Sequence, residues 1–153
     1  MYKRQALDRF PGTLLEGAVA DMLNSGAFAA NLRKVRGIYR EARDVLASTL
    51  SSASDGLLTV PVPSQGLHLV ARFDPLTDPH VAVTAKREAG VAGWLLAETC
   101  FRARPLPGFV LGFAGHKMPQ LIAAAERLAK SSLAAMGTRP RPKGTETGKV
   151  KHM

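Results

Sequence analysis

The apolar pattern of residues 26–51 limits the possible folds of this chain more than any other feature. Its apolar side chains recur at three- and four-residue steps, which brings them to one face of an α-helix. The predicted stripe consists of Phe28, Leu32, Val35, Tyr39, Ala42, Leu46 and Leu50. Arginines at positions 33, 36, 40 and 43 point away from much of this stripe. A helix of about 25 residues is long for a globular protein, so we expect it to flank a whole sheet or to bridge two domains.

The length and composition predict a single cytoplasmic domain. A chain of 153 residues matches the usual size of one domain, and an apolar content of 46% is enough for a core. No apolar run is long enough to span a bilayer, and the first residues lack the hydrophobic centre of a signal peptide. The single cysteine, Cys100, excludes an internal disulfide and a cysteine-built zinc site, and we interpret it as a small buried thiol.

The formal net charge of +9 leaves two interpretations open. Residues 138–153 carry five basic residues against one acidic residue, a net of +4, in a segment with almost no apolar side chains. Such a segment cannot bury enough surface to order itself, so we predict a disordered basic tail. The remaining charge is concentrated on the long helix, at Arg33, Lys34, Arg36, Arg40 and Arg43. These side chains form either a solvated helix face or a surface for nucleic acid or another partner.

The rest of the chain predicts an α+β fold in which helices cover a small, mostly antiparallel sheet. Asp78 is a suitable N-cap, Pro79 suits a first helical position, and Gly90 is a stop signal. In the strand at 66–73, Leu67, Leu69, Ala71 and Phe73 alternate with His68, Val70 and Arg72. We expect helices at 11–25, 26–51, 78–89 and from 119 to about 137, and strands at 57–60, 66–73, 91–96 and 109–114.

Part of the long helix also resembles a known pattern. The matching residues are Gly26, Phe28, Leu32, Arg33, Arg36, Tyr39, Arg43 and Asp44. They resemble the helix that opens the small, C-terminal domain of fold-type I pyridoxal-phosphate (PLP) aminotransferases, and are most similar to the aminotransferase-like half of MocR-type (GntR-family) transcriptional regulators. Asn31, Val35 and Ala42 depart from the usual His, Met and Arg. Blocks at 64–71, 87–91 and 108–114 extend the resemblance over roughly residues 9–130.

The resemblance implies three parts: a linker remnant at 1–10, a small-domain-like region at 11–136 and the basic tail at 137–153. In such regulators this domain closes over the cofactor cleft and responds to a small amino compound. The PLP-binding lysine lies in an upstream large domain, and DNA is bound by a winged helix further upstream. We find neither block here, so we expect no PLP and no transaminase activity from the chain alone. Its expected partner is the missing large domain or a homodimer partner. We expect no association with a membrane.

Among the candidate site residues, Val110 says most about whether this domain could serve a transaminase. In aminotransferases the matching strand commonly begins with an arginine whose guanidinium holds the substrate carboxylate. No arginine lies within 109–115, so the resemblance implies a domain unlike that of a standard transaminase. We assign no catalytic, cofactor-binding or metal-binding residue. His68 is interpreted as packed or hydrogen-bonded, His116 as solvated and Trp94 as core or interface packing, while the lysines are assigned to the surface: Lys34, Lys86, Lys117 and Lys130.

Two alternative functions remain open from the sequence. The chain is also compatible with the small domain of a complete PLP-dependent aminotransferase, which differs in having no winged helix upstream. A free-standing basic module for nucleic acid is the second alternative, and its affinity would fall steeply with salt. No strand interleaves aromatic and basic side chains as single-strand binders do.

Overall fold

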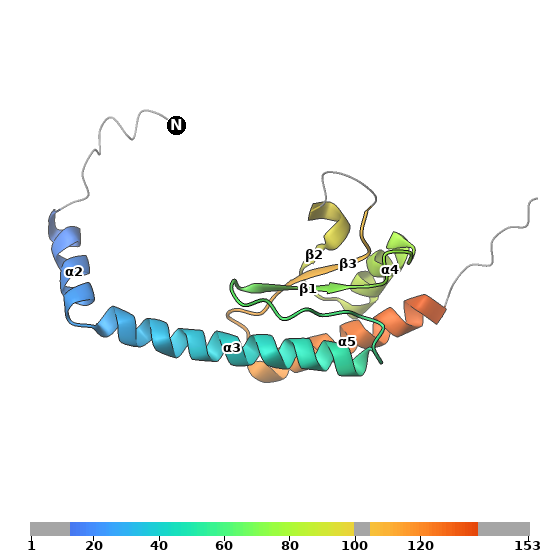
Figure 1. The fold of residues 1–153 in the computed structure, drawn as a ribbon, viewed down its shortest axis with the longest axis horizontal. Coiled ribbons are helices and arrows are strands. Elements are labelled where there is room, and N and C mark those ends of the chain that lie inside the picture. The colour runs from blue at the N-terminus through green and yellow to red at the C-terminus, as the bar shows by residue number, and fades with distance from the viewer. Residues whose placement is uncertain (1–12, 100–104, 138–153) are drawn as a thin grey trace, which may run out of the picture. The chain divides into compact units, whose positions relative to one another are not determined.

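The computed structural model describes residues 13–99 and 105–137 (Figure 1). The chain divides into two compact units, residues 1–42 and residues 43–153, which are described separately. The predicted linker remnant, Cys100 and all but the first residue of the predicted tail lie outside the described residues. The elements are α2 (Thr13–Asn24), α3 (Ala27–Ala53), β1 (His68–Arg72), α4 (Pro79–Ala89), β2 (Trp94–Leu95), the 3-10 helix η1 (Leu96–Thr99), β3 (Gly108–Gly112) and α5 (Met118–Gly137). No helix within these described ranges has the length and apolar character to cross a membrane.

The first unit consists of α2 and the N-terminal part of α3, joined by a tight turn. The predicted division between a helix at 11–25 and a helix at 26–51 is confirmed, because α2 ends at Asn24 and α3 begins at Ala27. Gly26 adopts the left-handed conformation, with φ of 75°, which glycine tolerates without a steric penalty. The Ser25 hydroxyl accepts a hydrogen bond from the Ala27 N–H at 3.4 Å, so Ser25 also helps to cap the start of α3.

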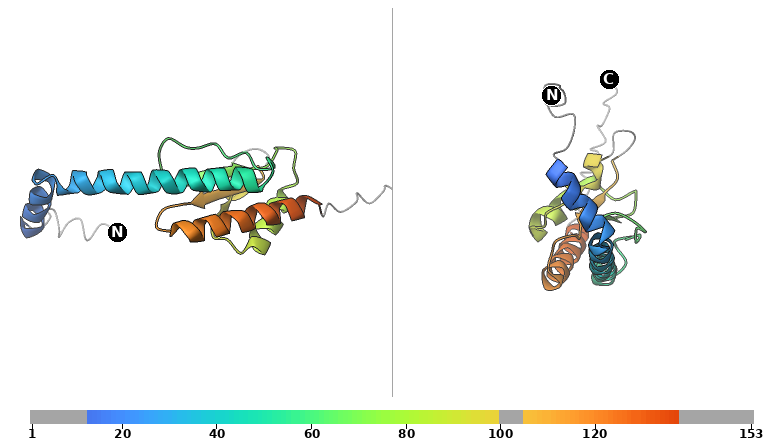
Figure 2. Two further views of the ribbon diagram at one scale, coloured as in Figure 1. Left: turned by 90° about the horizontal axis from the view of Figure 1, so that it is seen from below. Right: turned by 90° about the vertical axis from the view of Figure 1, so that its left-hand side faces the viewer.

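The second unit contains a three-stranded antiparallel sheet with the strand order β1-β3-β2. Leu69 lies opposite Leu111, and Ala71 lies opposite Phe109. These four side chains share the buried face of the sheet. The end of α3 and α5 lie on the same side of the sheet (Figure 2). The predicted α+β class, with helices covering a small antiparallel sheet, is therefore confirmed.

The core lies between the buried face of the sheet and the helices of the second unit. Phe73 and Phe109 meet edge to face with ring centroids 5.7 Å apart, a favoured aromatic geometry. Leu46 and Leu50 of α3 are buried, as are Leu121 and Leu128 of α5. Alanines supply the buried face of α4, at positions 82, 85 and 89. Small side chains there are compatible with the close packing of α4 on α5.

The predicted caps of the third helix are confirmed in α4. The Asp78 carboxylate accepts a hydrogen bond from the His80 N–H at 2.9 Å, and Pro79 occupies the first turn. Gly90 ends the helix in the left-handed conformation, with φ of 60°. The predicted bounds of this helix, 78–89, therefore agree with those of α4 to within one residue.

Three expectations about individual segments were wrong. Residues 57–60 make only one isolated bridge, between Thr59 and Arg72, because the prolines that follow cannot donate to a ladder. The strand expected at 91–96 is limited to Trp94 and Leu95, and η1 follows at once. Phe28 exposes 43% of its surface, although it belongs to the predicted buried stripe. Helical periodicity shows which side chains share a face, but not whether another element covers that face.

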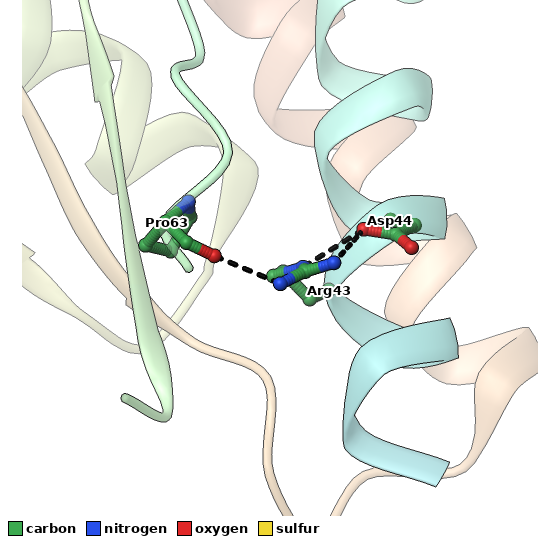
Figure 3. Close-up of polar contacts among 3 residues, drawn as sticks. All are labelled: Arg43, Asp44 and Pro63. Carbon is green, nitrogen blue, oxygen red and sulfur yellow. Dashed lines mark hydrogen bonds and ion pairs between the residues drawn. The ribbon is translucent and has the colours of Figure 1, made fainter. Parts of the chain in front are cut away.

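Arg43 has a structural role that the helix pattern did not predict. Its guanidinium donates a hydrogen bond of 2.8 Å to the Pro63 carbonyl oxygen, in the segment that leads to β1 (Figure 3). It also pairs with Asp44 at 2.7 Å, and its side chain is only 19% exposed. Arg43 therefore connects α3 to this segment and is not part of a freely solvated helix face.

Replacing Arg43 by alanine should lower the free energy of unfolding by about 1 to 2 kcal/mol, because a charge-assisted hydrogen bond to a partly buried carbonyl is lost. Arg40 is exposed one turn earlier on the same helix, so Arg40→Ala is the matched control and should cost less than about 0.5 kcal/mol. Urea unfolding of both variants measures the difference. Equal midpoints would show that the contact with Pro63 does not stabilise the protein.

Candidate functional site

The outward face of the sheet is the candidate site, because its side chains are accessible while those of the opposite face are buried. Val110, at the centre of this face, lies opposite Val70 of β1 and opposite Trp94 of β2. Directly paired residues in an antiparallel sheet point to the same side, so all three side chains belong to this face. Val70 and Val110 are partly buried, whereas Trp94 exposes 56% of its surface.

An aromatic pair occupies this face. The rings of His68 and Trp94 are stacked, with centroids 5.8 Å apart and planes inclined by 19°. They come from β1 and β2, which lie on opposite sides of β3. Gly112, which lies opposite His68 in the register, has no side chain to intervene at this point. His68 stacks on Trp94 but is exposed, and Trp94 is not core, because more than half of its surface remains available to another molecule.

Arg72 is the residue that the sequence reasoning did not connect with Val110. Alternation along β1 puts Arg72 on the same face as Val70. Arg72 lies opposite Gly108, so it is a diagonal neighbour of Val110, at the typical separation of about 7 to 8 Å that long side chains can cover. The register of β1 against β3 brings Arg72 close to Val110, and the order of residues in the chain does not reveal that register. A guanidinium therefore borders this face although Val110 itself is apolar.

A cavity of about 550 Å³ lies on the other side of the second unit, between the segment after α4 and the first turns of α5. Leu111 and Leu121 contribute apolar surface to it, and His116, Gln120 and Arg127 contribute polar atoms. His116 is exposed, in agreement with the prediction. This volume lies in the range of small-molecule pockets. None of the residues on the outward sheet face around Val110 lines it, apart from Gly112 at the edge.

The lysines singled out from the sequence and the metal-ligating side chains can be located within the described residues. A lysine that binds PLP needs a pocket that also holds the phosphate and the ring. Lys34, Lys117 and Lys130 are exposed and Lys86 is partly buried, and no lysine lines the cavity described above. Within residues 13–99 and 105–137, no three His, Asp or Glu side chains lie close enough together to hold a metal ion.

Comparison with known proteins identifies a relative. The chain is 33% identical over 106 residues to the probable rhizopine catabolism regulatory protein MocR of Rhizobium meliloti. The chain is related to part of a MocR-type regulatory protein. The match covers 69% of this chain but only 22% of that protein, so the chain spans about a fifth of the relative's length. No family model matches the chain.

Proposed function

We propose that this chain is a segment of a MocR-type (GntR-family) transcriptional regulator and acts there as the domain that closes over the effector cleft, without catalysis of its own. The observation that carries the proposal is the identity of 33% with a regulatory protein over 106 residues. In this proposal PLP is held by an upstream domain of the complete regulator, DNA is bound by a further upstream domain, and the effector is a small amino compound.

The outward face of the sheet supports the proposed role. A domain that closes over a cleft needs one face that packs on its own helices and one that stays accessible to the cleft. The sheet has this division, with Leu69, Ala71, Phe109 and Leu111 on the buried face. Trp94, His68 and Arg72 on the other face offer an aromatic surface and a cation, which suit contact with a small polar molecule or with the rim of a cleft.

Val110 favours a regulator over a catalytic aminotransferase. An apolar side chain cannot donate the paired hydrogen bonds with which an arginine holds a carboxylate. Arg72 lies on the adjacent strand and is exposed. Its guanidinium is therefore not at the position of the aminotransferase arginine and is less preorganised than that arginine. Binding without turnover requires less precise placement of a substrate than catalysis does. The small domain of a complete aminotransferase therefore remains the less supported assignment.

The proposal predicts that the isolated chain forms no covalent PLP adduct. Incubation with PLP, reduction with borohydride and mass spectrometry of the peptides should show no stoichiometric modification of any one lysine. Scattered substoichiometric labelling is expected, since exposed amines such as Lys130 react weakly with any aldehyde. A single lysine labelled to completion would contradict the assignment of the cofactor to an upstream domain.

A chimera tests the cleft-closing role itself. In it, the matching segment of the rhizopine regulator is replaced by the 106 aligned residues of this chain. We expect the chimera to bind PLP and to change reporter transcription when its effector is added. The variant Trp94→Ala with Arg72→Ala should reduce the effector response while the PLP content stays unchanged. Lys130→Ala, on the exposed side of α5, is the control and should change neither. A full response in the double variant would refute the role of this face.

A further inference from the structure

The cavity beside α5 combines an apolar floor with a polar mouth. All of its lining residues belong to the second unit. The floor consists of buried leucines from α3, β3 and α5, namely Leu46, Leu111, Leu121 and Leu128. The mouth consists of exposed polar side chains from the loop after β3 and from α5, namely His116, Gln120 and Arg127. A ligand with one apolar end and one polar end therefore matches this cavity better than a uniformly polar one.

Arg127 has unused hydrogen-bonding capacity at this mouth. Its Nε–H donates to the Ala89 carbonyl oxygen at 3.3 Å, at the C-terminal end of α4. Within the described ranges the Nη1 and Nη2 groups of Arg127 make no hydrogen bond, and the ion pair found there is that of Arg43 with Asp44. Because Ala89 already holds one side of the guanidinium, less conformational entropy is lost when the other side binds a ligand.

The charge of the mouth selects the polar end of the ligand. Among the lining residues that the structure describes, none is Asp or Glu, so an ammonium group would find no counter-ion there. A guanidinium pairs instead with a carboxylate or a phosphate through two parallel hydrogen bonds. Arg127 supplies one permanent positive charge, whereas a phosphate monoester carries about −1.5 to −2 at neutral pH. A single carboxylate is therefore the better match, and the Gln120 amide can donate a further hydrogen bond to it.

We propose that this cavity binds a small monocarboxylate with an apolar body, such as a short fatty acid or an aryl-substituted acid. Arg127 holds the carboxylate at the mouth, and the hydrocarbon part packs against the leucines of the floor. The volume of about 550 Å³ suits a molecule of this class. An α-helix with its side chains is about 10 to 12 Å across, so a single turn would already fill the cavity. A partner helix is therefore not a suitable occupant.

The basic segment at residues 138–153 is also a less suitable occupant. Its net charge of +4 would be repelled by Arg127, and it has almost no apolar side chains for the floor. The inference does not depend on the regulatory role proposed above. That role concerns a small amino compound and the outward face of the sheet, and neither Val110 nor Trp94 of that face lines the cavity. The two proposals can therefore fail separately.

Titration of the full chain with octanoate and with phenylbutyrate, followed by NMR, tests the site. We expect saturable shifts of the backbone amides of Gly90 and Ala124, which line the cavity, while the indole N–H of Trp94 stays unchanged. Octanamide and octylamine have the same apolar body without the negative charge. Both should bind more weakly than octanoate by about tenfold or more, because the charge-assisted hydrogen bonds to Arg127 are lost.

Variants of α5 test the two parts of the cavity. Arg127→Gln should weaken octanoate binding by about tenfold or more, whereas Lys130→Gln removes the same charge outside the cavity and should leave the affinity unchanged. Ala124→Leu fills space in the cavity and should weaken both acids. Ala134→Leu makes the same change on α5 outside the lining and is its control. Circular dichroism checks that all four variants are folded.

Several results would overturn the proposal. One is the absence of saturable binding by either acid in the millimolar range, and another is octanamide binding as tightly as octanoate. An equal loss of affinity in Lys130→Gln and Arg127→Gln would show that the effect is one of net charge. Nuclear Overhauser contacts between residues 138–153 and Ala124 in the free chain would assign the cavity to the basic segment. Shifts of Gly90 and Ala124 that follow protein concentration without a ligand would assign it to a second copy.

Discussion

Replacing Phe109 by alanine should lower the free energy of unfolding by about 3 to 5 kcal/mol, the usual range for a buried aromatic side chain. Phe109 is fully buried at the centre of the sheet, opposite Ala71, and its ring packs edge to face against Phe73. Alanine would remove this aromatic contact and leave a cavity beneath the middle strand. Because small domains are stable by only about 5 to 15 kcal/mol, the variant should show a much lower urea midpoint.

Two further variants keep this prediction testable if the alanine variant does not fold. Phe109→Leu retains most of the apolar volume and should cost clearly less than Phe109→Ala in the same titration. Leu76 exposes 77% of its surface in the loop before α4, so Leu76→Ala should cost less than about 0.5 kcal/mol. A Phe109→Ala protein with the urea midpoint of Leu76→Ala would show that the middle strand does not organise the core.

The parts of the fold that depend on neighbouring residues in the sequence could be predicted. Asp78, Pro79 and Gly90 define α4 because a cap acts on backbone groups within one turn of itself. The alternation of His68, Leu69, Val70 and Ala71 predicted which side chains of β1 share a face, because the pleat of a strand has a period of two. Such signals operate over a few residues, so they can be recognised before the tertiary structure is known.

The features that depend on distant parts of the chain were not predictable. The pairing of Val110 with both Val70 and Trp94 follows from the strand order, and so does the proximity of Arg72 to this position. Arg43 looked like one more charge on a basic helix until the carbonyl of Pro63, 20 residues further along the chain, proved to be its acceptor. Phe28 matched a buried stripe by its spacing, but burial requires a covering element, and spacing contains no information about that.

The candidate site also has one feature that the sequence predicts and others that depend on distant parts of the chain. The resemblance predicts that Val110 stands where aminotransferases have an arginine, because that argument needs only the aligned residues, and it stays a prediction. It did not locate the stacked pair of His68 and Trp94, which is formed by the two strands on either side of β3. If the outward face contacts an effector or the rim of a cleft, its specificity therefore depends on three strands together and not on the single position that differs from the aminotransferases.

Gly108→Ala should be the second strongly destabilising change, with an expected loss of about 2 to 3 kcal/mol in the free energy of unfolding. A Cβ at this position would lie 2.6 Å from the Ala71 carbonyl oxygen and 2.9 Å from the Arg72 Cα. Both are backbone atoms of β1, so no side chain can turn away to relieve the contact. The two strands would have to separate at the end of their ladder, where Arg72 lies opposite Gly108.

Gly112→Ala is the matched control for this prediction, because Gly112 lies at the other end of the same strand, opposite His68. A Cβ there would lie 3.5 Å from the His68 ring, an ordinary van der Waals distance. Alanine also reduces the conformational entropy of the unfolded chain, so Gly112→Ala should be neutral within about 0.5 kcal/mol or slightly stabilising. If Gly108→Ala unfolded at the same urea concentration as Gly112→Ala, then β1 and β3 would not approach as closely at Gly108 as the structure describes. Arg72 would then lie further from Val110, and its assignment to the candidate site would have to be withdrawn.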